Sequence, residues 1–530
     1  MKKITILLYS LISLCIVDSA DCQIKFQKVI TGTSHVLAYG VQQTTDGGYI
    51  IAGTAYNAQS NEDLYVVKTD AWGDTLWTKT FSGSDTQHCY SVEQTSDGGY
   101  ILFGVTNSFI GNKDFFLLKL SSNGNVVWTK NLINEGGSWS SFARQTSDGG
   151  FILVGQTDSV GNTNDDIFLV KTDSAGTPLW QRVIGISTAH DYVSCVQQTY
   201  DGGFVLAASG RYFGPDLDFC LIKTNANGNV QWKKVYGGAS SEGAVYVSQT
   251  SDSGYIMVGE TYSFTPGETD IYLVRTDANG DTLWTRCYSG QNSDHGMYVA
   301  QTPDGGFIIG GHVYTFGSVG GDHYDFALIK TNSNGDTLWT RTYGDSQDDY
   351  GWSAQQTSDG GYVITGYSRS FGTGDNHIYL VKTDSLGNSG GCYEYGTVIT
   401  SFRPPSQMGN PVIPAFITTT PWSNVSFTEG HTGIPATLCT SSSINETEYG
   451  TSFQVYPNPS SGDLFVLYDG ISTNIKLEIY NALGISIYSG LLSNKSEKEI
   501  RFKNFPSGIY FVKVFDGEKS YCKKLIIEHD

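Results

Sequence analysis

The chain has 530 residues, enough for two or three domains, and a formal net charge of −20 at pH 7. Glycine (63), tyrosine (33) and phenylalanine (26) are abundant, whereas charged residues make up only 16% of the chain. This composition suits many short strands joined by tight turns and argues against helical and disordered classes. The negative charge disfavours nucleic acids and anionic membrane surfaces as partners, because both carry charge of the same sign.

The first segment has the pattern of a signal peptide. Lys2 and Lys3 precede an apolar run over residues 4–17, which is too short to span a membrane. We expect cleavage after a signal peptide of residues 1–22 and an exported mature chain without a transmembrane segment. Cys22 follows Asp21, a poor residue before a lipidated cysteine, so lipidation is disfavoured.

Residues 24–391 are dominated by an internal repeat of about 52 residues. A repeat contains four strand-like runs, the second after an Asp-Gly-Gly motif and the last around a tryptophan, as in residues 100–104 and 283–286. Glycine-centred turns such as residues 277–280 supply the positive φ that tight hairpins need. The motif starts at seven places: Asp46, Asp97, Asp148, Asp201, Asp252 (as Asp-Ser-Gly), Asp304 and Asp359.

The two ends of the repeat region complement each other. Six repeats carry the tryptophan, and the seventh has Gly390 and Gly391 at that place. Phe26 lies 51 residues before Trp77, and a cation follows two positions after the aromatic residue in both segments. A parallel β-helix needs no such permuted end, whereas a ring removes its open edges this way. We therefore predict an all-β chain with a seven-bladed β-propeller over residues 24–391, closed by the N-terminal strand.

The repeats resemble the DGGY…KTD…GD..W propeller-like repeats of secreted bacterial and archaeal proteins. Residues 70–77 are also similar to the tryptophan-docking motif of quinoproteins and to the Asp-box of sialidases, each with a one-residue difference in spacing. Both motifs are structural in their own families, so these resemblances imply architecture and not catalysis.

Residues 453–530 lack the repeat and show alternating apolar runs broken by Gly and Pro, which predicts a small Ig-like β-sandwich. The YPNP start, the Y-N-x-x-G hairpin and the P-S-G-I-Y-F-V-K-V strand resemble the type A C-terminal sorting domain of the type IX secretion system of Bacteroidota. The resemblance implies recognition by the secretion translocon and its sortase, followed by anchoring at the outer-membrane surface or release. The sorting-motif residues are Tyr456, Pro457, Asn458, Pro459, Gly484 and Gly508.

Between these parts, residues 392–450 are rich in Thr, Ser and Pro and are interpreted as a linker with a small β element. Cys392 and Cys439 bracket it and could form a disulfide in an oxidising exterior. Four further cysteines have no metal-type spacing and suit buried single thiols: Cys89, Cys195, Cys220 and Cys287.

The loops between repeats vary in sequence and share one face, which is where function usually lies on a rigid scaffold. There the pattern suggests an acidic, aromatic entrance suited to a sugar or a cation, although the loops of an acidic chain are acidic anyway and aromatic residues also pack between blades. The candidate ligand-binding residues are Trp139, His190, Asp191, Glu242, Asp294, His295, Asp349 and Trp352.

No nucleophile, metal or phosphate-binding motif is present, so we predict no catalytic residues, metal ligands or cofactor. The leading hypothesis is a secreted or cell-surface binding or scaffold protein whose ligand is a glycan or a protein. One alternative is a glycoside hydrolase or polysaccharide lyase that uses acidic residues at the propeller entrance. Another is a structural adhesin. The regularity of the repeats favours binding or structure over catalysis.

Overall fold

In the computed structural model, the described residues are 23–395 and a series of strands between residues 399 and 527. Within the first range, short gaps occur at 33–34, 57–60, 84, 108–113, 133–140, 158–164, 186–189, 212–214, 265–267, 291, 319–320, 373–374 and 391–392. All regular elements in these residues are β-strands, which confirms the all-β class. The predicted signal peptide lies outside the described residues.

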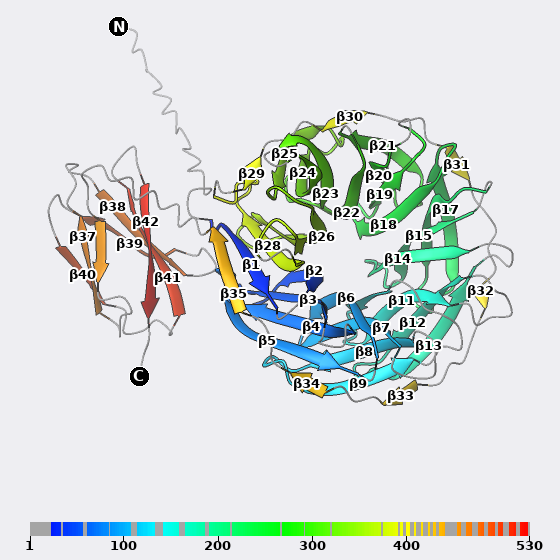
Figure 1. Ribbon diagram of the computed structural model, residues 1–530, viewed down its shortest axis with the longest axis horizontal. Helices are drawn as coiled ribbons and strands as arrows, with labels where there is room; N and C mark the ends of the chain where they lie inside the picture. The colour runs from blue at the N-terminus through cyan, green and yellow to red at the C-terminus, as the bar shows by residue number, and fades with distance from the viewer. Residues whose placement is uncertain are drawn as a thin grey trace, which may run out of the picture.

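Seven sheets follow the repeats and lie around a common centre in a propeller-like arrangement (Figure 1). Sheet 1 contains β2 (Val36–Gln43), β3 (Tyr49–Tyr56), β4 (Glu62–Thr69) and β5 (Thr75–Ser82), and sheet 2 contains β6 (Gln87–Gln94), β7 (Tyr100–Thr106), β8 (Asp114–Leu120) and β9 (Val126–Leu132). Sheet 3 contains β10 (Ser141–Gln145), β11 (Phe151–Thr157), β12 (Asp166–Thr172) and β13 (Pro178–Ile184), and sheet 4 contains β14 (Asp191–Gln198), β15 (Phe204–Gly210), β16 (Asp218–Thr224) and β17 (Val230–Gly237). Sheet 5 contains β18 (Glu242–Gln249), β19 (Tyr255–Thr261), β20 (Asp270–Thr276) and β21 (Thr282–Ser289), and sheet 6 contains β22 (Asp294–Gln301), β23 (Phe307–Ser318), β24 (Gly321–Thr331) and β25 (Thr337–Tyr343). Sheet 7 contains β26 (Asp349–Gln356), β27 (Tyr362–Ser368), β28 (His377–Thr383) and the N-terminal β1 (Phe26–Thr31).

The Asp-Gly-Gly motif closes the first hairpin of each sheet, and a cation from the third strand holds it. In sheet 1, Asp46 Oδ1 accepts a hydrogen bond of 3.0 Å from Gly48 N, and Lys68 Nζ lies 2.9 Å from Asp46 Oδ2. A Cβ at Gly48 would lie 2.1 Å from the Thr69 carbonyl oxygen, so this position requires glycine. The ion pair recurs in all seven sheets, with Arg275 in place of lysine in sheet 5. The Asp-Gly-Gly and Lys-Thr-Asp motifs of the sequence are thus two halves of one contact.

The fourth-strand tryptophans fill the space between neighbouring sheets. Trp77 of sheet 1 packs edge-on against Tyr100 of sheet 2, with ring centroids 6.0 Å apart, and five further tryptophans repeat the contact at 5.7 to 6.0 Å. Phe26 makes the same contact with Tyr49 at 5.9 Å. Edge-to-face pairs of this kind stabilise a fold beyond the area they bury. The N-terminal phenylalanine therefore occupies the tryptophan position of sheet 7.

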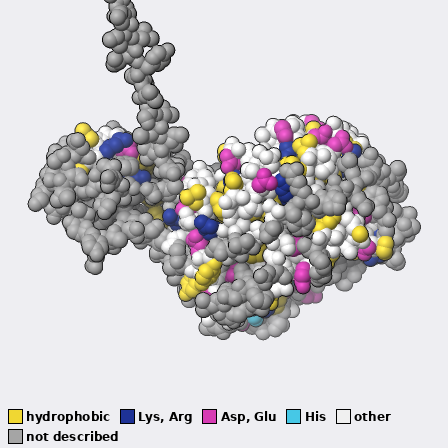
Figure 2. Space-filling model, turned by 90° about the horizontal axis from the view of Figure 1, so that it is seen from above, with side chains coloured by type: hydrophobic (Ala, Val, Ile, Leu, Met, Phe, Trp, Pro, Cys, Tyr) yellow, Lys and Arg dark blue, Asp and Glu magenta, His cyan; other side chains and the backbone are white. Residues whose placement is uncertain are grey.

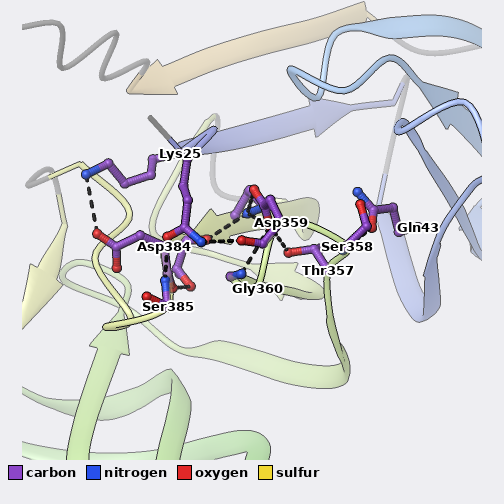
Figure 3. A network of polar contacts seen from close by, with 12 residues as sticks. Lys25, Gln43, Thr357, Ser358, Asp359, Gly360, Asp384 and Ser385 are labelled. Carbon is purple, nitrogen blue, oxygen red and sulfur yellow. Dashed lines mark hydrogen bonds and ion pairs between the residues drawn. The ribbon is translucent and has the colours of Figure 1, made fainter. Parts of the chain in front are cut away.

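The N-terminal segment is joined to the last repeat along its whole length. β1 pairs antiparallel with β28, with Phe26 opposite Lys382. Just before β1, Gln23 accepts a 2.8 Å hydrogen bond from Ser385 N, and Lys25 Nζ lies 3.4 Å from the Asp384 carboxylate (Figure 3). These contacts connect residues from opposite ends of the repeat array.

Short strands between residues 394 and 439 form an outer belt that the sequence did not predict. Its short strands are β29 (Glu394–Tyr395), β30 (Thr400–Phe402), β31 (Gln407–Gly409), β32 (Ala415–Phe416), β33 (Trp422–Asn424), β34 (Thr428–Gly430) and β35 (Ile434–Cys439). They pair antiparallel, in reverse order around the repeats, with β25, β21, β17, β13, β9, β5 and β1 (Figure 1). Instead of one small β element in a linker, each repeat sheet gains a fifth strand that covers its outer edge. Cys392 and the Cys439 side chain lie outside the described part, so the disulfide stays a prediction.

The C-terminal strands form two further sheets around one apolar core. One contains β36 (Phe453–Tyr456), β37 (Asp463–Tyr468) and β40 (Glu497–Arg501), and the other contains β39 (Ser486–Leu492), β38 (Ile475–Asn481), β41 (Gly508–Phe515) and β42 (Ser520–Ile527). Val466 of the first sheet packs in the same cluster as Leu477 and Val512 of the second. Two sheets that share a core in this way are the basis of a sandwich.

Candidate functional site

The first strands of the repeat sheets lie nearest the centre (Figure 1), and six of them contain a β-bulge. A bulge places two residues opposite one on the partner strand and bends the bulged strand. The residue skipped in the pairing register is Tyr39, Tyr90, Ser194, Val245, Met297 or Trp352. All six line a cavity of about 610 Å³ to which the first strands of all seven sheets contribute. The bulges thus turn these side chains toward the common centre of the sheets.

Aromatic rings form two arcs in this cavity. The first arc lies at the bulges of sheets 7, 1 and 2, where the Tyr39 ring contacts Trp352 at 5.5 Å and Tyr90 at 5.8 Å between centroids. The second arc lies one residue further along the strands. There, Tyr246 of sheet 5 contacts Phe142 of sheet 3 at 5.9 Å and Tyr298 of sheet 6 at 4.9 Å. All six aromatic residues line the cavity and are only half-buried.

Charged groups lie beyond the second arc. The Arg144 guanidinium donates a hydrogen bond to the Tyr246 hydroxyl and lies 5.3 Å from the centroid of Phe142. Glu93 of the neighbouring sheet accepts a 2.6 Å hydrogen bond from Gln145 N. Burial raises the pKa of Glu93, and the nearby Arg144 opposes this shift. This part of the cavity therefore combines aromatic faces with the charged groups of Arg144 and Glu93.

A histidine–carboxylate pair lies at the side of the cavity in sheets 5 and 6. His295 Nδ1 lies 2.7 Å from Glu260 Oε1, and Glu260 lines the cavity. The His295 ring stacks on His312 at 4.7 Å, and His312 lies 6.1 Å from the Trp352 ring. Burial lowers the pKa of His312 to about 3, so this ring is neutral at ordinary pH. Tyr324 packs against both histidines and continues the aromatic surface onto β24.

Three of the sequence-predicted carboxylates, Glu242, Asp294 and Asp349, accept hydrogen bonds from their own loops. Asp191, Glu242, Asp294 and Asp349 begin the first strands of sheets 4 to 7, and all are fully buried. Glu242 Oε2 accepts a 3.1 Å hydrogen bond from Gly238 N, four residues earlier, and Asp349 Oδ2 accepts one of the same length from Asp345 N. Gly290 N donates to Asp294 in the same way. This contact closes the loop between two sheets, as an amide does in sheet 2, where Gln87 accepts from Gly83 N at 2.8 Å.

Burial changes the ionisation of these loop-closing acids. It raises the pKa of Asp349 to about 7, with a further contribution from the neighbouring Asp325. It also raises the pKa of Asp294 to about 7, where Asp270 is the acidic neighbour and the Gly290 and Tyr314 amides act in the opposite direction. Each neighbour belongs to the third strand of the preceding sheet. The raised values follow from buried carboxylates that face each other across a sheet boundary.

The other predicted site residues are divided between the cavity and its rim. Trp352 lines the cavity, and His295 reaches it through Glu260. His190 pairs with Asp165 at 3.0 Å on the loop face, outside the residues that line the cavity. Trp139 lies outside the described residues. In the side view of Figure 2, acidic and basic side chains are dispersed over the part of the described surface that faces the viewer.

Sequence reasoning missed most of the cavity. The missed residues are Tyr39, Tyr90, Glu93, Phe142, Arg144, Tyr246, Glu260 and Tyr298. One available signal was Arg144, which stands before Gln145-Thr146 where three other repeats have glutamine, at Gln42, Gln197 and Gln355. A cation at a position where no other repeat has one marks a departure from the repeat.

A family model described as a secretion system C-terminal sorting domain matches residues 454–528. This match agrees with the sorting domain expected from the C-terminal motifs. Tyr456 ends β36 and Gly508 begins β41, whereas Pro457, Asn458, Pro459 and Gly484 lie outside the described residues. The sorting domain indicates secretion or cell-surface localisation and an interaction with the secretion machinery. No helix in the described part of the chain is long and apolar enough to cross a membrane.

Solved structures of several proteins are similar to the chain at low identity. Sqt1 from Chaetomium thermophilum is 10% identical, over 71% of this chain and 100% of that chain, with a TM-score of 0.36. The α-L-arabinofuranosidase Arb93A from Fusarium graminearum, solved with an iminosugar inhibitor, is 12% identical over 68% and 98%, with a TM-score of 0.37. The tail fibre of Staphylococcus aureus phage P68 is 7% identical over 95% and 96%, with a TM-score of 0.22. No curated protein matches the sequence. These TM-scores are low, so the functional argument rests on the residues of this chain.

Proposed function

We propose that this chain is an exported carbohydrate-binding protein that holds its ligand in the central cavity of a closed, seven-bladed β-propeller. The observation that carries the proposal is the cavity of about 610 Å³, with aromatic arcs and the polar groups of Glu93 and Arg144. Sugar rings present apolar C–H faces and hydroxyl edges, so binding sites for them combine aromatic faces with a few hydrogen-bonding groups. Of the candidates from the sequence, the proposal keeps Trp352 and His295 and assigns Glu242, Asp294 and Asp349 to loop closure.

Two sets of contacts support closure of the ring. Phe26 occupies the tryptophan position between sheets 7 and 1, next to Tyr49. The glutamine that ends a first strand accepts a hydrogen bond from the first-hairpin turn of the preceding sheet. Gln94 of sheet 2, for example, accepts from Thr45 N of sheet 1 at 2.8 Å. The same contact joins the last sheet to the first, because Ser358 N donates to Gln43 at 2.7 Å. A single repeating contact that also joins the two ends of the array is expected of a closed ring.

The export route follows from the two ends of the chain. The signal peptide of residues 1–22 would direct the chain across the inner membrane, and the sorting domain would present it to the type IX translocon and its sortase. Removal of the sorting domain would leave the propeller with its outer belt, either attached to the outer-membrane surface or released. The belt ends at Cys439, before the sorting domain begins. It therefore stays with the propeller when cleavage falls between the two.

A glycan array probed with the full mature chain tests the proposal, with reducing-sugar release assayed on every hit. We expect binding without turnover, and weaker binding by a Trp352→Ala variant. Absence of binding to any glycan would refute the carbohydrate proposal and favour a protein ligand or a structural adhesin.

A second candidate function is glycoside hydrolysis or polysaccharide lysis. It is supported by two carboxylates that line the cavity, Glu93 and Glu260. Burial raises the pKa of Glu93, as suits a general acid, and Glu260 is paired with His295. Turnover that is abolished by both Glu93→Gln and Glu260→Gln would establish this reading in place of simple binding.

A further inference from the structure

The residue before the last position of the first strand has a recurring structural role in most of the sheets that carry a polar acceptor there. In four sheets its side chain accepts a hydrogen bond from the backbone of the next sheet. Examples are Gln355, which accepts from Gln43 N at 2.8 Å, and Gln197, which accepts from Gln249 N at 2.7 Å. Gln42 and Glu93 make the same contact with the sheets that follow them. The task requires a side-chain acceptor that is held against the neighbouring strand.

Arg144 occupies this position in sheet 3 and cannot perform the task, because a guanidinium has five donors and no acceptor. It reaches instead past sheet 4 to sheet 5, where it donates to the Tyr246 hydroxyl. Its guanidinium carbon lies 5.8 Å from the Tyr246 ring centroid and 5.3 Å from that of Phe142. The repeat thus loses one contact between sheets and gains a cation inside the cavity.

The charge of Arg144 is poorly compensated. Within the described residues, Arg144 forms no ion pair with a carboxylate oxygen within 4.0 Å. Glu93 is a more distant neighbour, and one of its oxygens already accepts from Gln145 N. Arg144 Nε is buried without a hydrogen-bond partner. Arg144 is half-buried, and a guanidinium that is partly removed from water is costly unless anionic or hydrogen-bonding partners satisfy it.

From this geometry we infer that Arg144 is an anion subsite and that the ligand of the cavity is an acidic carbohydrate. The inference rests on the proposed function and narrows it from carbohydrates in general to sugars with a carboxylate or sulfate group. The planar guanidinium presents parallel donors that match two oxygens of such a group. The Phe142 and Tyr246 rings beside it hold its plane, so little side-chain entropy is lost when the anion binds.

The test compares an oligogalacturonate with its fully methyl-esterified counterpart of the same length, by titration calorimetry on the full mature chain at about 0.15 M salt. A charge-assisted bidentate contact predicts that the acid binds about 10- to 100-fold more tightly than the ester. A sulfated oligosaccharide of equal length is the second arm and distinguishes sulfate from carboxylate as the natural group. Preference for either anionic oligomer over the neutral one supports the inference.

Variants assign the preference to the side chain. Arg144→Met should abolish the preference for the acid and leave the affinity for the neutral ester within about threefold. Arg144→Lys should retain part of the preference, because lysine keeps the positive charge but lacks the two parallel donors of the guanidinium. The matched control is Arg182→Met. Arg182 also stacks on an aromatic ring, that of Trp180 at 5.3 Å, but neither residue lines the cavity. This control should keep the wild-type preference, and melting curves of each variant verify folding.

The outcomes separate the two proposals. Binding of neutral and acidic glycans with equal affinity, or an acid preference that survives in Arg144→Met, overturns the anion subsite and leaves carbohydrate binding in place. Failure to bind any glycan overturns the proposed function itself. The comparison of acid and ester on the wild-type chain needs no variant, so a poorly folded Arg144→Met protein does not prevent the test.

Discussion

Replacing Phe26 with alanine tests whether the ring is closed by the N-terminal strand. Phe26 is 1% exposed, and its ring packs between Tyr49 and the turn at Gly73, where an added Cβ would lie 2.6 Å from the ring. Truncating a buried phenylalanine costs about 3–5 kcal/mol. In a protein of this size each kcal/mol lowers the melting temperature by about 1–2 °C, so we expect a decrease of about 3–10 °C. Hydrogen exchange of the β1 and β28 amides should accelerate together.

Two matched variants show whether the position behaves as part of a ring. Trp232→Ala removes an equivalent aromatic residue in the middle of the array, where Trp232 packs on Tyr255 at 5.8 Å. In a closed ring the two alanine variants should lower the melting temperature to a similar extent. In an open array, loss of Phe26 would affect only a terminal strand. Phe26→Trp restores the residue of the other six repeats and should be at least as stable as the wild type. An unchanged melting temperature and unchanged β1 exchange in Phe26→Ala would refute closure.

Three further perturbations follow from the cavity, the buried acids and the belt. Trp352→Ala removes the largest ring of the first aromatic arc and should weaken glycan binding about tenfold, whereas Tyr262→Ala, an exposed aromatic residue at 51%, should not change the affinity measured by calorimetry. Asp349→Asn should gain stability relative to the wild type as the pH rises. The folded-state pKa of Asp349 is raised from 3.8 to about 7, so the folded protein binds more protons and the contribution of this carboxylate falls as the pH passes through about 7. Because one pKa unit corresponds to about 1.4 kcal/mol and the loss accumulates between the unfolded and folded pKa values, the difference in melting temperature between variant and wild type should grow from about pH 4 to about pH 8, and parallel curves would contradict the assignment. A chain that ends after residue 391 loses the belt and exposes the outer strand edges, so it should self-associate in size-exclusion chromatography with light scattering. A chain that ends after residue 440 keeps the belt and should have the same oligomeric state as the wild type; the same oligomeric state for both truncated chains would argue against edge protection.

The sequence predicts those contacts of the fold that recur in every repeat. The aspartate of the Asp-Gly-Gly motif and the third-strand lysine recur at fixed spacing because they meet in every sheet, as Asp46 and Lys68 do at 2.9 Å. The fourth-strand tryptophan recurs because every sheet boundary needs a ring of that size. Such contacts link residues at fixed separations, so repetition alone reveals them.

The cavity and the belt depend on information that repetition does not contain. Whether Tyr39 or Arg144 faces the centre is decided by a bulge and by the convergence of seven strands from distant parts of the chain. The belt strands contain between two and six residues, too few for an alternating pattern, and they pair through backbone groups that any residue except proline supplies. The low-complexity composition of this segment therefore indicated a linker.

The central cavity exists because the repeats depart from symmetry in a coordinated way. At the bulge, sheets 7, 1 and 2 carry Trp352, Tyr39 and Tyr90, whereas sheets 4, 5 and 6 carry the smaller Ser194, Val245 and Met297. One residue later the order is reversed: sheets 7, 1 and 2 carry Ser353, Gly40 and Ser91, and the rings of Phe142, Tyr246 and Tyr298 come from sheets 3, 5 and 6. A ring of large residues at one level would fill the axis, as layered side chains do in small barrels. Because the two aromatic arcs lie at different levels, the central cavity stays open between them, and Arg144 lines this cavity as a cation. Repeated positions hold the scaffold together, and the binding chemistry is found where the repeat is broken.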